Sequence, residues 1–155
     1  MSAAAKAKKL EGRFSPEERA AMKDRAAELK AEVRRASAEE KAAADAAAVQ
    51  AKIAEMPQPD RSTVERLHAI VNQAAPELLP KLYYGQPGWA RAGGKVIVFF
   101  RSGLVDKARY STLGFSAEAK LDEKGGLWPT SYAVQEVTDD GAKTIAKLVE
   151  KAVLS

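Results

Sequence analysis

The bulky side chains of this chain are crowded into one part of it. Nine of the ten aromatic residues lie between positions 83 and 132, and only Phe14 precedes them. Alanine supplies much of the apolar content of the first half, and an alanine buries little surface when it packs. A chain of 155 residues with 46% hydrophobic residues is long enough to bury one core. We therefore expect the globular domain to lie in the second half.

The first half has the pattern of a long helical arm. Ser15, Pro16 and Glu18 mark its start, because a serine can cap a helix, a proline suits the first helical position, and the glutamate completes a capping box. A second capping box at Ser37 either restarts the helix or lies inside it. Between the two capping boxes, apolar residues recur at spacings of four, three and four and form one thin stripe on a helix otherwise covered by charges: Met22, Ala26, Leu29 and Val33.

The two prolines of Met56-Pro57-Gln58-Pro59-Asp60 predict where the arm stops. Each proline disfavours a helical conformation at the residue before it. We expect residues 1–14 to form a disordered leader, residues 15–56 the helical arm and residues 57–155 the folded domain.

Helices are predicted at both ends of the domain. The first begins at a third capping box, at Ser62, and ends before Pro76. The last is capped by Thr138. The apolar faces of the two helices are formed by Val64, Leu67, Val71 and Ala74 in the first and by Ile145, Leu148, Val149 and Val153 in the last.

Four extended segments lie between these helices. Residues 89–92 and 95–100 have the pattern of a hairpin with Gly93-Gly94 as its turn, and residues 109–115 and 131–137 are the third and fourth strands. Residues 95–100 are almost continuously apolar, so we expect both faces of this strand to be covered. The order predicts an α+β fold: a small antiparallel sheet of about four strands flanked by helices and preceded by a long N-terminal helical arm.

Composition narrows the possible functions. The absence of cysteine excludes disulfides, thiolate metal sites and cysteine nucleophiles, and the single histidine, His68, excludes a histidine-rich metal site within one chain. The net charge of +4 is spread over both halves, which favours a solvated surface over nucleic-acid binding. The sequence predicts neither a signal peptide nor a membrane helix, so we expect a cytoplasmic protein.

Aromatic and proline residues near short glycine turns suggest a ligand-binding groove. Rigid rings can form the walls of a concave site, and hydroxyl or indole groups can orient a ligand there. The opposing interpretation is that these residues fill the domain core, which is the usual place for large aromatics. The candidates for the groove are Tyr84, Pro87, Trp89, Trp128, Pro129 and Thr130.

Three blocks of sequence carry a resemblance to a known family. Tyr83-Tyr84-Gly85-Gln86-Pro87 leads to Trp89, Thr112-Leu113-Gly114-Phe115-Ser116 follows, and Gly126-Leu127-Trp128-Pro129-Thr130 comes last. In order and spacing these blocks resemble the YdhG-like domain family, a bacterial group of largely unknown function, over residues 79–153. Two positions depart from that pattern: Gln86 stands where methionine is usual, and Gly88 where alanine is common.

The resemblance implies a possible ligand as well as a fold. Some members of the family are described as frataxin-like intracellular iron chaperones, and iron in such a role would be held by carboxylate oxygens on an exposed surface. The candidate iron ligands are Glu118, Asp122 and Glu123 in the loop before Trp128, followed by Glu136, Asp139 and Asp140. The opposing interpretation is that Asp139 and Asp140 serve a helix N-terminus and that the loop is an ordinary exposed turn.

The sequence therefore favours a non-enzymatic binding protein. No activated nucleophile and no poised acid and base pair can be identified, and serines such as Ser102 have no base beside them in the sequence. The first expectation is a YdhG-like domain that binds iron, a small ligand or a protein partner. The alternative is an interaction or oligomerisation module that acts through the helical arm, with the domain as its scaffold.

Overall fold

The computed structural model describes residues 14–154, so the expected leader lies outside the described residues except for Phe14. By its internal contacts the chain divides between Glu39 and Glu40 into two units. One helix, α2 (Pro16–Glu55), is continuous through Ser37, so the second capping box lies inside it. The first capping serine acts as predicted, because Ser15 Oγ accepts a hydrogen bond from the Glu18 amide at 3.0 Å.

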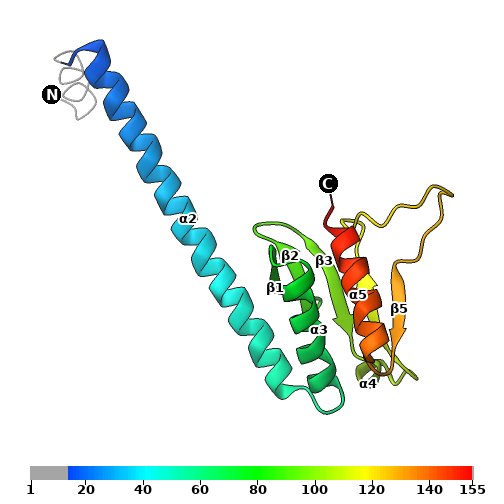
Figure 1. The fold of residues 1–155 in the computed structure, drawn as a ribbon. Coiled ribbons are helices and arrows are strands. Elements are labelled where there is room, and N and C mark those ends of the chain that lie inside the picture. The colour runs from blue at the N-terminus through cyan, green and yellow to red at the C-terminus, as the bar shows by residue number, and fades with distance from the viewer. Residues whose placement is uncertain (1–13, 155) are drawn as a thin grey trace. The chain divides into compact units, whose positions relative to one another are not determined.

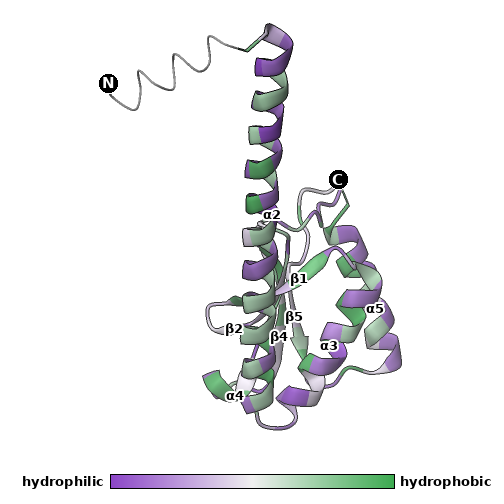
Figure 2. Ribbon diagram, turned by 90° about the vertical axis from the view of Figure 1, so that its left-hand side faces the viewer, coloured by the Kyte–Doolittle hydropathy of each residue, from purple (hydrophilic) through white to green (hydrophobic). Residues whose placement is uncertain are grey.

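The second unit contains a five-stranded antiparallel sheet with its strands in chain order (Figure 1). The strands are β1 (Leu78–Tyr83), β2 (Gln86–Arg91), β3 (Val96–Arg101), β4 (Ser111–Phe115) and β5 (Ser131–Val134). The short helix α4 (Gly103–Asp106) joins β3 to β4. Helices α3 (Asp60–Ala74) and α5 (Asp139–Ala152) lie side by side on one face of the sheet, as Figures 1 and 2 show from two directions. The predicted α+β arrangement is therefore confirmed.

The strand that the sequence did not predict is β1, at the edge of the sheet. It contains Pro80, which pairs with Trp89 of the neighbouring strand. Proline cannot donate a ladder hydrogen bond and argues against a central strand, but an edge strand tolerates it. The turn into β2 consists of Tyr84 and Gly85, both with positive φ, as a two-residue type I′ hairpin turn requires.

The predicted hairpin around Gly93-Gly94 is present with a longer connection. Residues 92–95 join β2 to β3, and the Gly94 amide donates to the Arg91 carbonyl at 2.8 Å. The expectation that β3 is covered on both faces also holds at Phe99, whose ring packs against the Tyr83 ring with centroids 4.6 Å apart. Gly114 leaves room for this ring, because a Cβ atom there would come within 2.2 Å of Phe99 Cζ.

The two domain helices begin in different ways. Thr138 caps α5 as predicted, since its Oγ1 accepts from the Gly141 amide at 3.0 Å. The predicted start of α3 at Ser62 is wrong, because that helix begins at Asp60. The Ser62 amide and hydroxyl instead both donate to Gln58 Oε1, at 3.1 and 2.7 Å, so a glutamine in the preceding loop satisfies the first turn.

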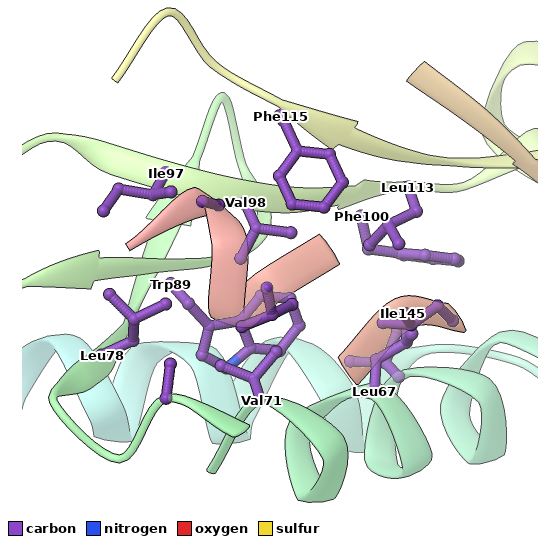
Figure 3. Packing of buried hydrophobic residues seen from close by; sticks show 14 of the residues in the cluster. Leu67, Val71, Leu78, Trp89, Ile97, Val98, Phe100, Leu113, Phe115 and Ile145 are labelled. Atoms are coloured by element: carbon purple, nitrogen blue, oxygen red, sulfur yellow. The ribbon is translucent and has the colours of Figure 1, made fainter. Parts of the chain in front are cut away.

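The hydrophobic core fills the space between the sheet and its helices. Figure 3 shows Trp89, Val98 and Phe100 from the sheet facing Leu67 and Val71 of α3. Within the second unit the core also includes three residues from before the expected boundary at position 57, all at most 4% exposed: Val49, Ile53 and Met56. The last turns of α2 are therefore part of the packed unit.

Candidate functional site

The six residues predicted to form an aromatic groove do not share one open surface. Trp89 is fully buried and Pro87 is buried beside it in β2, whereas Tyr84 is 86% exposed at the turn before that strand. Trp128 is half-buried against the core. Pro129 and Thr130 follow it as exposed residues. Trp89 and Pro87 thus belong to the domain core, which was the alternative to a ligand-binding groove.

The indole of Trp89 has a specific polar partner. Its Nε1 donates to His68 Nδ1 at 3.0 Å, and the two rings are stacked with centroids 6.2 Å apart. Because an indole can only donate, Nδ1 must carry a lone pair, and the neutral His68 ring therefore holds its proton on Nε2. Asn72 Nδ2 lies 3.1 Å from that nitrogen, so a half-turn of the Asn72 amide, which exchanges its nitrogen and oxygen, gives the Nε2 proton an acceptor. Burial lowers the pKa of His68 below its usual value, which favours the same neutral form.

The carboxylates considered for iron lie apart from a common centre. Glu118, Asp122 and Glu123 are exposed, and Glu123 Oε1 accepts from Lys151 Nζ at 2.6 Å. Asp139 forms a 2.8 Å ion pair with Arg66. Among the described residues, no three histidine, cysteine, aspartate or glutamate side chains are grouped so that they could hold a metal ion.

A small cavity with a mixed polar and apolar lining lies where the end of α2, the start of α3, the start of β2 and helix α4 meet. Its volume is about 130 Å³. The polar and charged residues that line it are Lys52, Glu55, Asp60, Gln86 and Ser102, and the apolar ones are Met56, Pro57, Leu104 and Val105.

Asp60 and Ser102 form the floor of this cavity and are the two buried polar residues of the described chain, at 4% and 1% exposure. The Ser102 hydroxyl donates to Asp60 Oδ2 and accepts from the amides of Leu104 and Val105 as the N-cap of α4. Its proton and its acceptor sites are thus all engaged, so the hydroxyl has no free lone pair for nucleophilic attack. The pair fixes α3 to α4 across the end of the sheet.

Gln86 adds an unusual feature to the cavity. Its Oε1 is buried and has no hydrogen-bond partner among the described residues. A buried polar atom without a partner costs on the order of 1–3 kcal/mol, and such an atom calls for an explanation. Sequence reasoning missed this site because Asp60, Gln86 and Ser102 are far apart in the chain and match no motif. The only signal was the departure of Gln86 from the methionine usual in the resembling family.

The exposed stripe of the first unit is the second candidate site. Among residues 16–39, no side chain is buried, and Met22, Leu29 and Val33 are 49%, 46% and 66% exposed. Leu29 and Val33 line a shallow surface hollow together with Lys30 and Arg34. No helix in the described part of the chain is long and apolar enough to cross a lipid bilayer.

Comparisons of this chain with protein-family models, with curated proteins and with solved structures found no match. The resemblance to the YdhG-like family therefore rests on the sequence blocks alone.

Proposed function

We propose that this protein is a non-enzymatic interaction protein that self-associates through its N-terminal helix, with the compact unit as its scaffold. The observation that carries the proposal is the exposed apolar stripe of residues 16–39, in a stretch of α2 where no side chain is buried. Most helical stability in proteins comes from packing an apolar face. Contact with another helix would supply that packing.

A second copy of the same helix, in antiparallel orientation, can pack against this surface. The apolar residues of the stripe are spaced by four, three and four positions, as in the contact line, or seam, between two helices of a coiled coil. An antiparallel copy centred between Ala27 and Glu28 places the small Ala26 opposite Leu29 and Met22 opposite Val33. A parallel copy would instead put Ala26 on Ala26 and leave a gap at the centre. Size matching thus favours the antiparallel pair.

Charged residues beside the seam influence how strongly the two copies are expected to associate. The antiparallel pairing brings Arg25 near Glu32 of the second copy, but it also brings Lys23 near Lys30. Arg25 is also held within 3.2 Å of Glu28 in its own helix. These effects offset each other, so the apolar contacts carry the association. Two heptads bury little surface, and we expect weak self-association that depends little on salt.

Sedimentation equilibrium of the full chain over a wide concentration range tests this proposal. The mean mass should rise with concentration, and Leu29→Gln with Val33→Gln should keep it at the monomer value. Ala31→Gln, on the opposite side of the helix, is the matched control and should behave like the parent. A concentration-independent monomer mass for the parent chain would overturn the proposal, as would equal association of all variants.

The resemblance supports a separate proposal, that the compact unit carries iron. Under it, anaerobic titration with ferrous iron gives saturable binding that is lost when Glu118, Asp122 and Glu123 are changed to their amides. Heat of dilution alone would reject this role. Because Glu123 is already engaged by Lys151, Lys151→Met should strengthen any iron binding that Glu123 contributes.

A further inference from the structure

We propose that the outer face of the sheet, which points away from α3 and α5, binds a short stretch of single-stranded nucleic acid. The inference does not depend on self-association through the helix, because all five strands belong to the unit that begins at Glu40. It rests on three observations: a cluster of aromatic rings outside the core, glycines over which these rings extend, and positive charges on strands that contain no carboxylate.

Alternation along the strands places Phe99 on the outer face. Its neighbours Val98 and Phe100 belong to the core and face α3 (Figure 3), so the Phe99 side chain points the other way. The register of the strands then defines a row on the outer face that runs through all of them: Lys81, Gly88, Phe99, Gly114 and Ser131. The next row contains Arg101, Thr112 and Ala133.

Three aromatic residues form a cluster on this face. The centroid of the Tyr83 ring lies 4.6 Å from that of Phe99 and 4.6 Å from that of Tyr84. The three residues lie outside the hydrophobic core, and Tyr84 is 86% exposed. Aromatic rings grouped on a surface provide π faces on which nucleic-acid bases stack, and such stacking tolerates any base.

Glycines explain how the rings lie. A Cβ atom at Gly114 would come within 2.2 Å of Phe99 Cζ, so the Phe99 ring extends across the neighbouring strand. Tyr83 lies two strands from Phe99 and reaches it over Gly88, where a Cβ atom would be 3.3 Å from Tyr83 Cβ. A glycine inside a strand often marks a place where a ligand approaches closely. The rings thus form a low surface, which suits the flat face of a base.

The charges of this face favour an anionic partner. Its strand residues include the cations Lys81 and Arg101, and none of the five strands contains a carboxylate. Lys81 Nζ donates to the Gly94 carbonyl at 3.3 Å and forms no ion pair with a described residue. Arg101 is paired with Asp106 at 2.6 Å. A second copy of the same face would bring like charges together, whereas a phosphate backbone complements them.

A further ring and a further cation lie just before β4. The Arg109 guanidinium is 5.3 Å from the centroid of the Tyr110 ring, which is 39% exposed. These two residues line a shallow surface hollow together with Ala133, Gln135 and Glu136. No ion pair joins Arg109 to Glu136, and the Arg109 carbonyl accepts from Gln135 Nε2 at 3.3 Å. The hollow thus offers a base a ring to stack on and its phosphate an adjacent cation.

The distribution of charge along the chain does not reveal this face. The mixed charges of the sequence favoured a solvated surface over nucleic-acid binding, but its carboxylates lie in helices and loops, and only the fold separates them from the strands.

The test is a fluorescence-anisotropy titration of labelled oligothymidylate and oligouridylate with the full chain at low salt. Saturable binding is expected, with a dissociation constant on the order of 100 µM. Two phosphate contacts, at Lys81 and Arg109, should give a plot of log association constant against log salt concentration a slope of about −1.4, at about −0.7 per contact. Leu29→Gln with Val33→Gln should bind like the parent, which separates this proposal from self-association.

Tyr84→Asn tests the stacking surface. The substitution removes an exposed ring and keeps the turn, because Asn-Gly is a preferred pair in a type I′ turn. It should weaken binding about fivefold or more, the effect of losing one stacked base. Leu127→Asn replaces a residue that is equally exposed, at 86%, in the loop before β5, and it should bind like the parent.

Charge variants test the phosphate contacts. Arg109→Gln should weaken binding and reduce the salt slope by about 0.7. Asp106→Asn releases Arg101 from its ion pair and should strengthen binding, a gain that damage to the fold cannot produce. Lys143→Gln, on the exposed surface of α5, is the control and should leave binding unchanged.

Four outcomes would each overturn the proposal. They are no saturable binding of either oligonucleotide at low salt, parent-like binding by folded Tyr84→Asn, equal affinity for polyphosphate, which has the charge but no bases, and binding to phosphatidylglycerol vesicles without binding to either oligonucleotide. The last would assign the face to a membrane surface.

Discussion

Trp89, in the second strand, donates the hydrogen bond of its indole Nε1 to Nδ1 of His68 in α3, at 3.0 Å. This bond exists only while His68 is neutral, because a protonated imidazole has no free lone pair at Nδ1. A large ring at the centre of the core is thus joined to the one residue of the chain that titrates near neutral pH.

We predict that the protein loses stability as the pH falls below about 6.5. Burial lowers the pKa of His68 in the folded state, so the unfolded chain takes up the proton first as the pH drops. The stability that depends on neutral His68 is fully present above the pKa that His68 has in the unfolded chain. It is lost progressively as the pH falls toward the lower pKa of His68 in the folded protein. Urea unfolding at several pH values measures this, and Trp89 fluorescence should fall in the same range.

The control for this prediction is His68→Gln. The glutamine offers a side-chain oxygen to the Trp89 indole and does not titrate near neutral pH. Its stability should change less with pH between 7 and 5 than that of the parent. If the free energy of unfolding changed equally with pH in both proteins, the pH dependence would come from groups other than His68.

Replacing Gln86 by methionine should stabilise the protein. The substitution conserves volume and removes a buried acceptor without a partner. We expect a gain of about 1–2 kcal/mol in the free energy of unfolding, measured with urea. Gln50→Met lies on an exposed helix surface and should change this value by less than about 0.5 kcal/mol. A loss of stability in Gln86→Met would mean that the amide has a partner in solution.

Gly103→Ala should be strongly destabilising. A Cβ atom at this position would lie 2.3 Å from the Tyr110 carbonyl oxygen and 2.6 Å from its carbon, and a backbone cannot move aside as a side-chain end can. We expect a cost of about 2 kcal/mol or more. Gly125→Ala has no atom within 4 Å of the new Cβ and serves as the control, with a change near zero. Thermal unfolding of the two variants side by side separates steric conflict from the general effect of losing a glycine.

The boundary of the folded unit can be tested with two fragments. Residues 40–155 retain Val49, Ile53 and Met56, whereas residues 57–155 lack all three. Each of these side chains contributes roughly 1.5–3 kcal/mol when fully buried. Their sum approaches the whole stability of a typical domain. We expect cooperative unfolding by circular dichroism for residues 40–155 and a greatly weakened or absent transition for residues 57–155. Equal stability of the two fragments would support the boundary expected at position 57.

Much of this fold is predictable from local patterns. The helix starts at Ser15 and Thr138, the alternation of residues 111–115 and the hairpin after Trp89 all depend on neighbours within a few positions, and all are present. Local patterns do not predict β1, because Pro80 argues against a strand. The proline is acceptable because β1 lies at the edge of the sheet.

The candidate site could not be predicted in the same way. Asp60 and Ser102 are 42 positions apart, and only the packing of α3 against the end of the sheet brings them together. The distinction between a groove and a core also depends on packing. The same aromatic residues are compatible with either pattern, and the burial of Trp89 becomes evident only when α3 is placed over it.

The order of the strands has a consequence for how the chain reaches its native state. Because every strand pairs with its neighbour in the chain, the sheet can form by successive short loop closures, and no distant segment has to be found first. Local strand pairing favours rapid formation of the sheet and leaves little time for unpaired strand edges to meet another chain. The longest of these loops, residues 116–130 between β4 and β5, has the largest entropy cost of closure. We therefore expect the addition of β5 to be the slowest step in forming the sheet.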